Sequence, residues 1–469
     1  MPFLLRLQKA LPLLFALVAV LSAGIYFFHN LGINPQYDNQ GIWHAVDLIT
    51  AHRQGKLSEF LLTTRKYPLF YILNYATIFG ILVEVDRAQL FLIGRIVTFL
   101  YATGILLLLL RLSKRMGNGA AAAVLLLTSL LFIMFASAIR PHIPVAFWTL
   151  LSFYFAVQMQ QKRTLWNTLG SFASALLAFC TLQSGLLAFL FPVWGMLGLR
   201  PKVIDMGKAA ILLIVCLALA VPLGYPFLLG GFFGNEVAVG VDLGHDVGLT
   251  YGISQSIVVI TGLLGSSPFI IGFALWGLTR LARRMDPLDP ILVPMIAYVA
   301  IFCAVFLFHS VATTRFFLPV LPFLCLLGAR GYRLSPGWLR SGSLLLVMAV
   351  FARFSWMSTL PDTYQQTTAF LQERPGLIAM IALPAYFFDI PTERLPAMEA
   401  DIPAVKSIVL PHDQTDKLDG SWRLCKDFIA SKSTDDIVLL WNDTPWAYYR
   451  VFEADSFGPN LAVYCKIES

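Results

Sequence analysis

The chain has 469 residues, of which 58% are hydrophobic and 13% charged, and its mean hydropathy is +0.72. Soluble domains carry about 25% charged residues, so this composition excludes a water-soluble protein and indicates an integral membrane protein. The net charge of +7 is explained by basic loops between apolar runs, so we expect no nucleic-acid partner.

Apolar runs of about 20 residues recur along the chain, which is the length that an α-helix needs to cross a bilayer. Transmembrane strands would instead need weakly alternating segments of about ten residues. We therefore predict an all-α polytopic membrane fold with about 11 transmembrane helices. The expected spans are 11–28, 89–110, 118–138, 142–158, 166–182, 184–199, 208–229, 254–279, 290–308, 315–329 and 341–357.

Lysine and arginine clusters alternate with loops that are poor in positive charge, and such clusters favour the cytoplasmic face. The alternation requires that segment 67–83 does not cross the membrane. Its Tyr67 and Tyr71 suit a helix at the outer interface, where aromatic rings lie at headgroup level. Residues 29–88 then form one large first exterior loop. The clusters are Arg6 and Lys9, 111–115, Lys162 and Arg163, Arg200 and Lys202, 280–284 and 330–340.

After residue 358 the sequence changes to mixed charge, prolines and short alternating runs. We predict a transmembrane catalytic domain over 1–358 and a small C-terminal α/β exterior domain over 359–469. The odd number of spans places this second domain outside. Within it we expect strands at Ser407–Leu410 and Asp436–Trp441, and helices at Thr363–Arg374 and Gly420–Lys432.

Two of the six cysteines, Cys425 and Cys465, belong to the predicted exterior domain. An oxidising compartment would permit a disulfide between them, although sequence spacing alone does not show their geometry. The other four lie in apolar spans and fit small packing residues.

Four short motifs lie in the predicted first loop and at predicted span ends: Tyr37–Gly41 around Asp38, Lys66–Tyr71, Ile139–His142 and Arg315–Pro322. In this order they resemble the motifs of the GT-C glycosyltransferases, in the branch of family 39 and its RgtA/B/C/D-like relatives, which is similar in plan to the aminoarabinose and protein mannosyl transferases. The resemblance covers residues 1–358. It implies a polyprenyl- or dolichyl-phosphate-linked sugar as donor, transfer at the outer membrane face, and Asp38 as the essential acidic residue.

The residue types at these motifs suit glycosyl transfer on chemical grounds. Asp38 is the candidate base, or the carboxylate that holds a metal or the acceptor hydroxyl. Lys66, Arg140 and Arg315 are candidates to bind the donor phosphate, whose charge grows as it leaves. Further candidate substrate contacts are Tyr37, His44, Asp47, Tyr67, His142 and His309.

Each candidate has a structural alternative. Asp38 fits an Asx turn or helix cap, Asp47 a solvated helix face, and Lys66 a snorkelling side chain. Relatives often have an Asp near position 142, so a metal site of two carboxylates is in doubt, and a divalent metal is left open with no other cofactor. Where relatives place Lys-Gly, this chain has Gln183-Ser184-Gly185.

We therefore predict a glycosyltransferase of the bacterial inner (plasma) membrane, with its active site facing the exterior. Its partners would be the bilayer, a polyprenyl-phosphate sugar, and an exterior glycan, lipid or protein acceptor. The first alternative is a lipid or small-molecule transporter or flippase, which predicts ionisable residues near span centres. A scaffold subunit is the second, and it would lack convergent cations beside a carboxylate.

Overall fold

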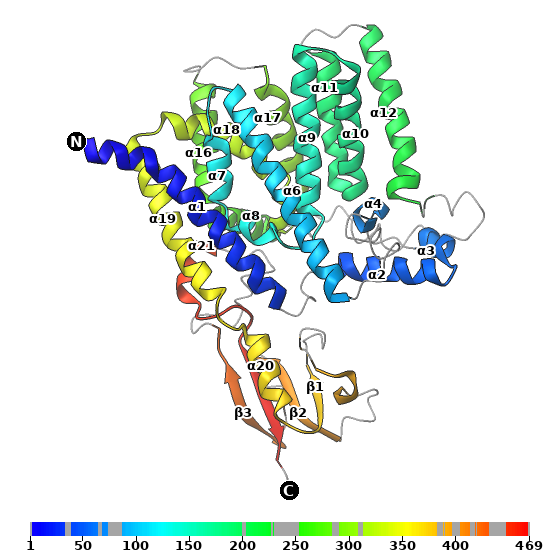
Figure 1. Ribbon diagram of the computed structural model, residues 1–469, viewed down its shortest axis with the longest axis vertical. Helices are drawn as coiled ribbons and strands as arrows, with labels where there is room; N and C mark the ends of the chain where they lie inside the picture. Colours follow the sequence, from blue (N-terminus) through cyan, green and yellow to red (C-terminus); the bar gives the residue numbers. More distant parts are fainter. Residues whose placement is uncertain are drawn as a thin grey trace.

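Helices form the described chain up to residue 357, and a four-stranded sheet follows them (Figure 1). This arrangement confirms the predicted fold class, a polytopic helical membrane protein with a small C-terminal α/β part. The computed structural model describes residues 2–32, 39–63, 68–73, 87–198, 203–226, 228, 253–283, 290–307, 313–381, 388, 390–395, 404–412, 418, 420–430 and 447–467.

The bundle contains both long helices and short turns. In chain order the elements are α1 (Pro2–Gly32), α2 (Asn39–Arg53), α3 (Leu57–Thr63), α4 (Leu69–Ile72), α6 (Arg87–Arg115), α7 (Ala121–Leu127), α8 (Leu130–Phe135), α9 (His142–Gln161), α10 (Leu165–Thr181), η3 (Gln183–Phe189), α11 (Leu190–Leu197), α12 (Val203–Gly224), α15 (Ile253–Ser266), α16 (Pro268–Ala282), α17 (Leu292–Phe306), η4 (Thr314–Phe317), α18 (Leu321–Leu334) and α19 (Gly337–Met357).

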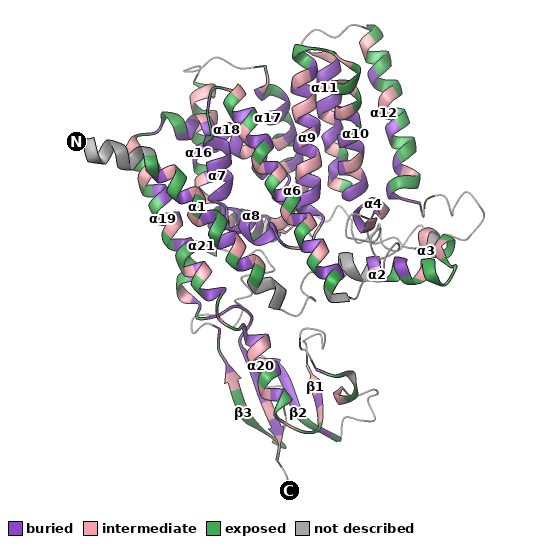
Figure 2. Cartoon of the chain, viewed as in Figure 1, coloured by how far each residue is buried: buried purple, intermediate pink, exposed green. Residues whose placement is uncertain are grey.

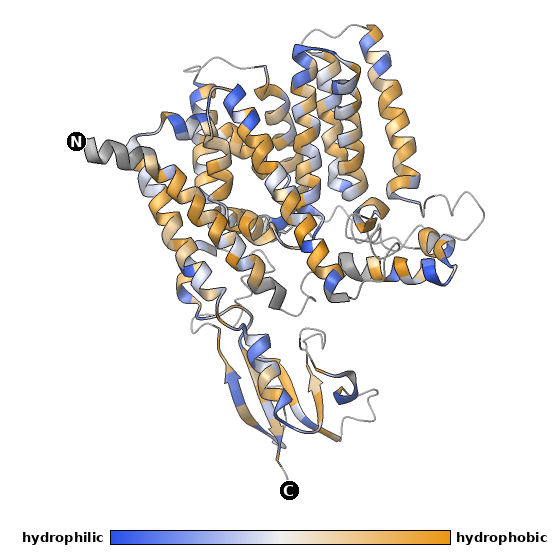
Figure 3. Cartoon of the chain, viewed as in Figure 1, coloured by the Kyte–Doolittle hydropathy of each residue, from blue (hydrophilic) through white to orange (hydrophobic). Residues whose placement is uncertain are grey.

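The outer helices expose many large apolar side chains, and contact of so many with water would be unfavourable. On α12, Val203 is 86% exposed and Ile214 66% exposed, and Figures 2 and 3 show the same helix as both exposed and hydrophobic. A continuous exposed apolar surface of this kind is buried by lipid. By length and composition α1, α6, α9, α12 and α19 each suffice to cross a membrane, and the bent pair α15–α16 makes a sixth candidate span.

Four predicted spans are wrong as single helices. The expected span 184–199 is divided into η3 and α11, and the expected span 315–329 into η4 and α18. The expected span 118–138 is broken into α7 and α8, and the expected span 254–279 is broken into α15 and α16, which meet at 99°. Ser129 caps α8 by accepting the Phe132 N–H at 3.1 Å, and Pro268, which lacks an N–H, starts α16. The hydroxyls of Ser129 and Ser267 share a 2.6 Å hydrogen bond, so the serine at each helix break has a hydrogen-bond partner at the other break.

The described part of the first loop packs under one end of the bundle as α2, α3 and α4 (Figure 1). Of the predicted interfacial helix 67–83, the structure describes the single helical turn α4. Its Ile72 and Tyr71 are buried against Leu48 of α2, Phe91 of α6 and Ile139. The loop is therefore attached to the membrane bundle by an apolar cluster of its own.

The C-terminal part is a mixed sheet in the order β1-β2-β4-β3. β1 runs parallel to β2, and β4 pairs antiparallel with both β2 and β3. Helix α20 packs on this sheet, burying Leu371 against Val409 and Leu461. The bounds are α20 (Thr363–Gln372), β1 (Leu377–Met380), η6 (Thr392–Arg394), β2 (Val405–Pro411), β3 (Trp422–Phe428), α21 (Ala447–Glu453) and β4 (Leu461–Lys466).

The helix predicted over Gly420–Lys432 is wrong, because most of that segment is strand β3. Pairing with β4 decides its conformation, and β4 itself lies more than 30 residues later in the sequence. The expected helix at Thr363–Arg374 corresponds to α20, and the expected strand at Ser407–Leu410 lies within β2. The strand expected at Asp436–Trp441 lies outside the described residues.

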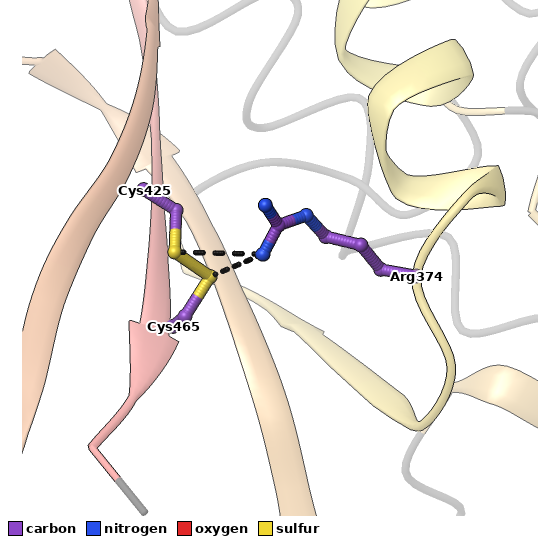
Figure 4. The surroundings of a disulfide bond; sticks show 3 residues. All are labelled: Arg374, Cys425 and Cys465. Carbon is purple, nitrogen blue, oxygen red and sulfur yellow. Dashed lines mark hydrogen bonds between the residues drawn. A yellow bond between two sulfur atoms is a disulfide. The ribbon is translucent and has the colours of Figure 1, made fainter.

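Cys425 and Cys465 form a disulfide between the neighbouring strands β3 and β4 (Figure 4). Cys425 lies where the register between the strands shifts, which brings it beside Cys465. The Arg374 guanidinium donates to the Cys465 sulfur at 3.1 Å and lies over the Phe370 ring. The disulfide and Arg374 thus tie the two last strands to the end of α20.

The segment 447–457 joins the sheet to the membrane bundle. Val451, Ala454 and Phe457 are buried in the same apolar core as the helices. Arg353 of α19 donates to the carbonyl oxygens of Ala454 at 2.6 Å and Val451 at 3.3 Å. The C-terminal part is therefore packed into the bundle rather than merely tethered to it.

Candidate functional site

The turn between α8 and α9 carries the first predicted phosphate ligand, Arg140. Pro141 fixes φ at −67°, which suits the start of a helix, and α9 begins at the next residue. His142 in this first turn is only 4% exposed. Its ring centroid lies 5.4 Å from that of Phe316 and 6.2 Å from that of Phe135.

The second predicted phosphate ligand, Arg315, lies on the short helix η4. Its guanidinium is 5.8 Å from the centroid of the Phe316 ring. The element lies against α15, and Gly262 permits this contact: a Cβ at that position would be 2.1 Å from the Thr314 hydroxyl oxygen. A side chain larger than hydrogen there would push η4 away from α15.

His142 brings the two segments together. Arg140 and Arg315 both lie close enough to its imidazole to interact with it electrostatically. Its Nδ1 is buried and has no hydrogen-bond partner within the described part of the chain. We refer to Arg140, His142 and Arg315 as the arginine site.

The first loop reaches this site through Tyr71. The Tyr71 hydroxyl donates to the carbonyl oxygen of Ile139 at 3.1 Å in a buried position, directly before Arg140 in the chain. Ile139 itself belongs to the apolar cluster that holds α2, α4 and the start of α6. The loop and the Arg140 turn are thus one packed unit.

No protein-family model matches the chain, and no curated protein matches it either. Solved structures do match. The crystal structure of ArnT from Cupriavidus metallidurans bound to undecaprenyl phosphate aligns with a TM-score of 0.52 at 12% identity, covering 96% of this chain and 97% of that chain. Its apo state gives a TM-score of 0.50 at 11% identity, with the same coverage.

The chain has the GT-C fold. The fold implied by the four motifs is therefore confirmed, and the structural likeness covers 96% of the chain rather than residues 1–358 alone. At this identity the likeness shows the fold and not the roles of residues.

Of the predicted site residues, Arg140 and Arg315 lie within electrostatic reach of His142, and the His142 ring lies beside that of Phe316, the residue after Arg315. Asp47 lies on α2 with an exposed side chain, and His44 lies in the same helix. The remaining predicted residues lie outside the described part of the chain: Tyr37, Asp38, Lys66, Tyr67 and His309.

Two residues beside the arginine site were not among the site residues predicted from the sequence. Tyr71 fitted an interfacial aromatic, and only the fold shows its hydroxyl on the Ile139 carbonyl. Thr313 precedes η4, and its hydroxyl is buried with no hydrogen-bond partner among the described residues. Nothing in the sequence around Thr313 distinguishes it from other threonines, so it could not have been predicted as a site residue.

The arginine site is suited to anions and not to metals. Two guanidinium groups offer the paired N–H donors that phosphate oxygens accept. In the described part of the chain no three His, Cys, Asp or Glu side chains lie together as metal ligands. A metal site that includes Asp38 lies outside the described residues and stays a prediction.

Proposed function

We propose that this protein is an inner-membrane glycosyltransferase that moves a sugar from a polyprenyl-phosphate-linked donor to an acceptor at the exterior face. The proposal rests on one observation above the others: Arg140 and Arg315 both lie close enough to the buried His142 to interact with it electrostatically, within a GT-C fold. The neighbour ArnT is described as bound to undecaprenyl phosphate, a lipid phosphate of the proposed class.

The arginine site binds the phosphate of the donor. As the bond between the sugar and the phosphate oxygen breaks, negative charge grows on the phosphate. Two fixed guanidinium groups stabilise that charge more strongly in the transition state than in the ground state. The Thr313 hydroxyl, two residues before Arg315, and His142 Nδ1 are buried polar groups, and they orient the phosphate or the adjoining sugar.

Asp38 acts on the acceptor. The acceptor hydroxyl oxygen forms a bond to the anomeric carbon, while the bond from that carbon to the phosphate oxygen breaks. The hydroxyl proton passes to the Asp38 carboxylate, and polyprenyl phosphate leaves. Lys66 joins the two arginines on the phosphate, while Tyr37, His44, Asp47, Tyr67 and His309 are the proposed substrate contacts of the first loop and of the segment before η4.

Donor screening tests the proposal directly. Purified protein in lipid nanodiscs is given several polyprenyl-phosphate sugars with a mixture of exterior glycolipid, polysaccharide and peptide acceptors, with and without chelator. Release of polyprenyl phosphate with transfer of the sugar is expected for at least one donor. Asp38→Asn should lower that rate about 10²–10⁴-fold while donor binding persists. An unchanged rate in Asp38→Asn would contradict the role of Asp38.

A lipid transporter is the second candidate, and one observation favours it. Transporters place broken helices beside their substrate, and α15 and α16 are broken at a buried serine pair. Movement of fluorescent polyprenyl phosphate between the leaflets of protein-containing vesicles, without sugar transfer from any donor, would replace the enzyme proposal with this one.

A further inference from the structure

A cavity of about 240 Å³ lies between helix ends that are remote from the arginine site. It is enclosed by the turn after α6, the last turns of α16 and α18, and Leu292 at the start of α17. At Gly277 on its wall, α16 and α18 touch backbone to backbone, since a Cβ there would be 2.6 Å from the Leu327 carbonyl oxygen. The cavity is therefore built by close helix packing and not by a loose loop.

The wall of this cavity combines apolar and cationic groups. Leu278, Leu281 and Leu326 form its apolar part, whereas Arg330 and Arg333 lie three residues apart on α18 and so share one helix face. The Arg333 guanidinium donates to the Gly117 carbonyl oxygen, which holds it at the cavity wall. Among the described residues of the lining there is no Asp or Glu.

The course of the chain places the cavity at the membrane face opposite the sheet. α18 ends at Leu334, α19 begins at Gly337, and α19 then runs for 21 residues to Met357, just before the C-terminal part (Figure 1). A helix of that length crosses roughly 30 Å. Other cations lie at the same face, among them Arg111 and Lys114 at the end of α6 and Arg283 after α16.

We propose that this cavity binds the phosphate headgroup of an anionic glycerophospholipid from the adjoining leaflet. Guanidinium groups recognise phosphate by paired N–H donors, and two of them are present on one wall. The leucine wall suits the first carbons of an acyl chain, and the volume is several times the roughly 30 Å³ share of one water. A soluble phosphate would leave the leucines without a partner, so the lipid is the ligand that uses both walls.

Lipid binding by the purified protein in detergent tests this site, with native mass spectrometry as the readout. Phosphatidylglycerol should bind at least about tenfold more tightly than phosphatidylcholine, because the choline ammonium of phosphatidylcholine would lie close to the two guanidinium groups and be repelled by them. The double variant Arg330→Gln/Arg333→Gln should lose this preference. Leu281→Trp, which keeps both charges and fills the apolar part, should also weaken binding.

The matched control is Arg111→Gln/Arg283→Gln, which removes two charges from the same face outside the cavity lining. It should keep the preference for phosphatidylglycerol. Equal loss in the control would show general attraction to a basic surface and would overturn the proposal. Unchanged binding in Leu281→Trp, or equally tight competition by soluble glycerol phosphate, would overturn it as well. Sugar transfer plays no part in these measurements.

Discussion

At the scale of single residues, Tyr71 joins the first loop to the turn that carries Arg140. Removing its hydroxyl in Tyr71→Phe leaves the buried Ile139 carbonyl without this donor, at a cost of about 1–3 kcal/mol. We expect faster amide hydrogen exchange at 139–142 and a higher KM for the donor. Tyr154→Phe, on α9 and away from this turn, is the control. Equal exchange in both variants would show that Tyr71 does not hold the turn.

Asp362 makes the junction between α19 and α20 sensitive to pH. It is fully buried and caps α20 by accepting the Gln365 N–H at 2.7 Å. Burial raises its pKa from 3.8 to about 6, although backbone hydrogen bonds from Gln365 and Tyr364 act in the opposite direction. The folded state thus binds the proton more tightly than the unfolded state does.

The sign of the effect follows from that difference in proton binding. The stabilising contribution is complete below pH 3.8 and is lost as the pH rises through about 6. Asp362→Asn keeps a cap acceptor without the charge, so its Tm should fall less than that of the parent protein between pH 5 and 7.5. A parallel pH dependence of the two Tm values would exclude Asp362 as the source.

At the scale of elements, the contact between α15 and η4 positions Arg315. Gly262→Ala adds a methyl group 2.1 Å from the Thr314 hydroxyl oxygen, so η4 must shift, at a cost of about 1–3 kcal/mol for overpacking. Because a displacement of about 1 Å can lower a rate about 100-fold, sugar transfer should fall much more than the amount of folded protein.

Gly272→Ala on α16 is the matched control for this substitution, because a Cβ there would meet nothing within 4 Å. Its transfer rate should equal that of the parent protein. Equal rates in Gly262→Ala and the parent would mean that the position of η4 does not matter for transfer.

The helix α21 depends on Arg353 for its place in the bundle. Besides its two carbonyl contacts, the Arg353 guanidinium lies 4.1 Å from the centroid of the Trp356 ring. Arg353→Gln should therefore speed hydrogen exchange across 447–457 and make that segment sensitive to protease. Arg340→Gln, at the other end of the same helix, should leave both unchanged. Slow exchange retained in Arg353→Gln would assign the docking of α21 to its apolar contacts alone.

The helices and strands differ in how far they could be predicted from the sequence. Spans such as 142–158 and 341–357 were found because apolar length is a local property, and they correspond to α9 and α19. The breaks at Ser129 and Ser267 were missed because their shared hydrogen bond joins residues 138 positions apart. Strand β3 was taken for a helix for a similar reason, since its partner β4 lies far along the chain.

At the scale of the whole molecule, the arginine site was predictable only in part. Arg140 and Arg315 were identified by their motifs, and the fold brings both to His142. The buried hydroxyl of Thr313 and the contact of Tyr71 with Ile139 depend on tertiary packing, which no spacing in the sequence reveals. The role of Asp38 stays a prediction, because that residue lies outside the described part of the chain.

The whole molecule also has two distinct ends. The start of α6 packs with Ile139, so the arginine site and the described part of the first loop lie at one end of the bundle. Helix α19 begins at the opposite end and runs back to the sheet, which therefore lies toward the same end as the arginine site. The cavity beside Arg330 and Arg333 lies at the opposite end. The two proposed anion sites therefore need separate tests, and charge variants at one end serve as controls for the other.

The central claim is that Arg140 and Arg315 together bind the donor phosphate. Binding of undecaprenyl phosphate to the purified protein in nanodiscs measures this most directly. In Arg140→Gln/Arg315→Gln the affinity should fall by at least about tenfold, since hydrogen bonds to charged groups contribute about 1.5–3 kcal/mol each. Arg111→Gln/Arg283→Gln, with the same charge change at the opposite end, should bind as the parent does. Equal affinity of the Arg140→Gln/Arg315→Gln variant and the parent protein would contradict the claim.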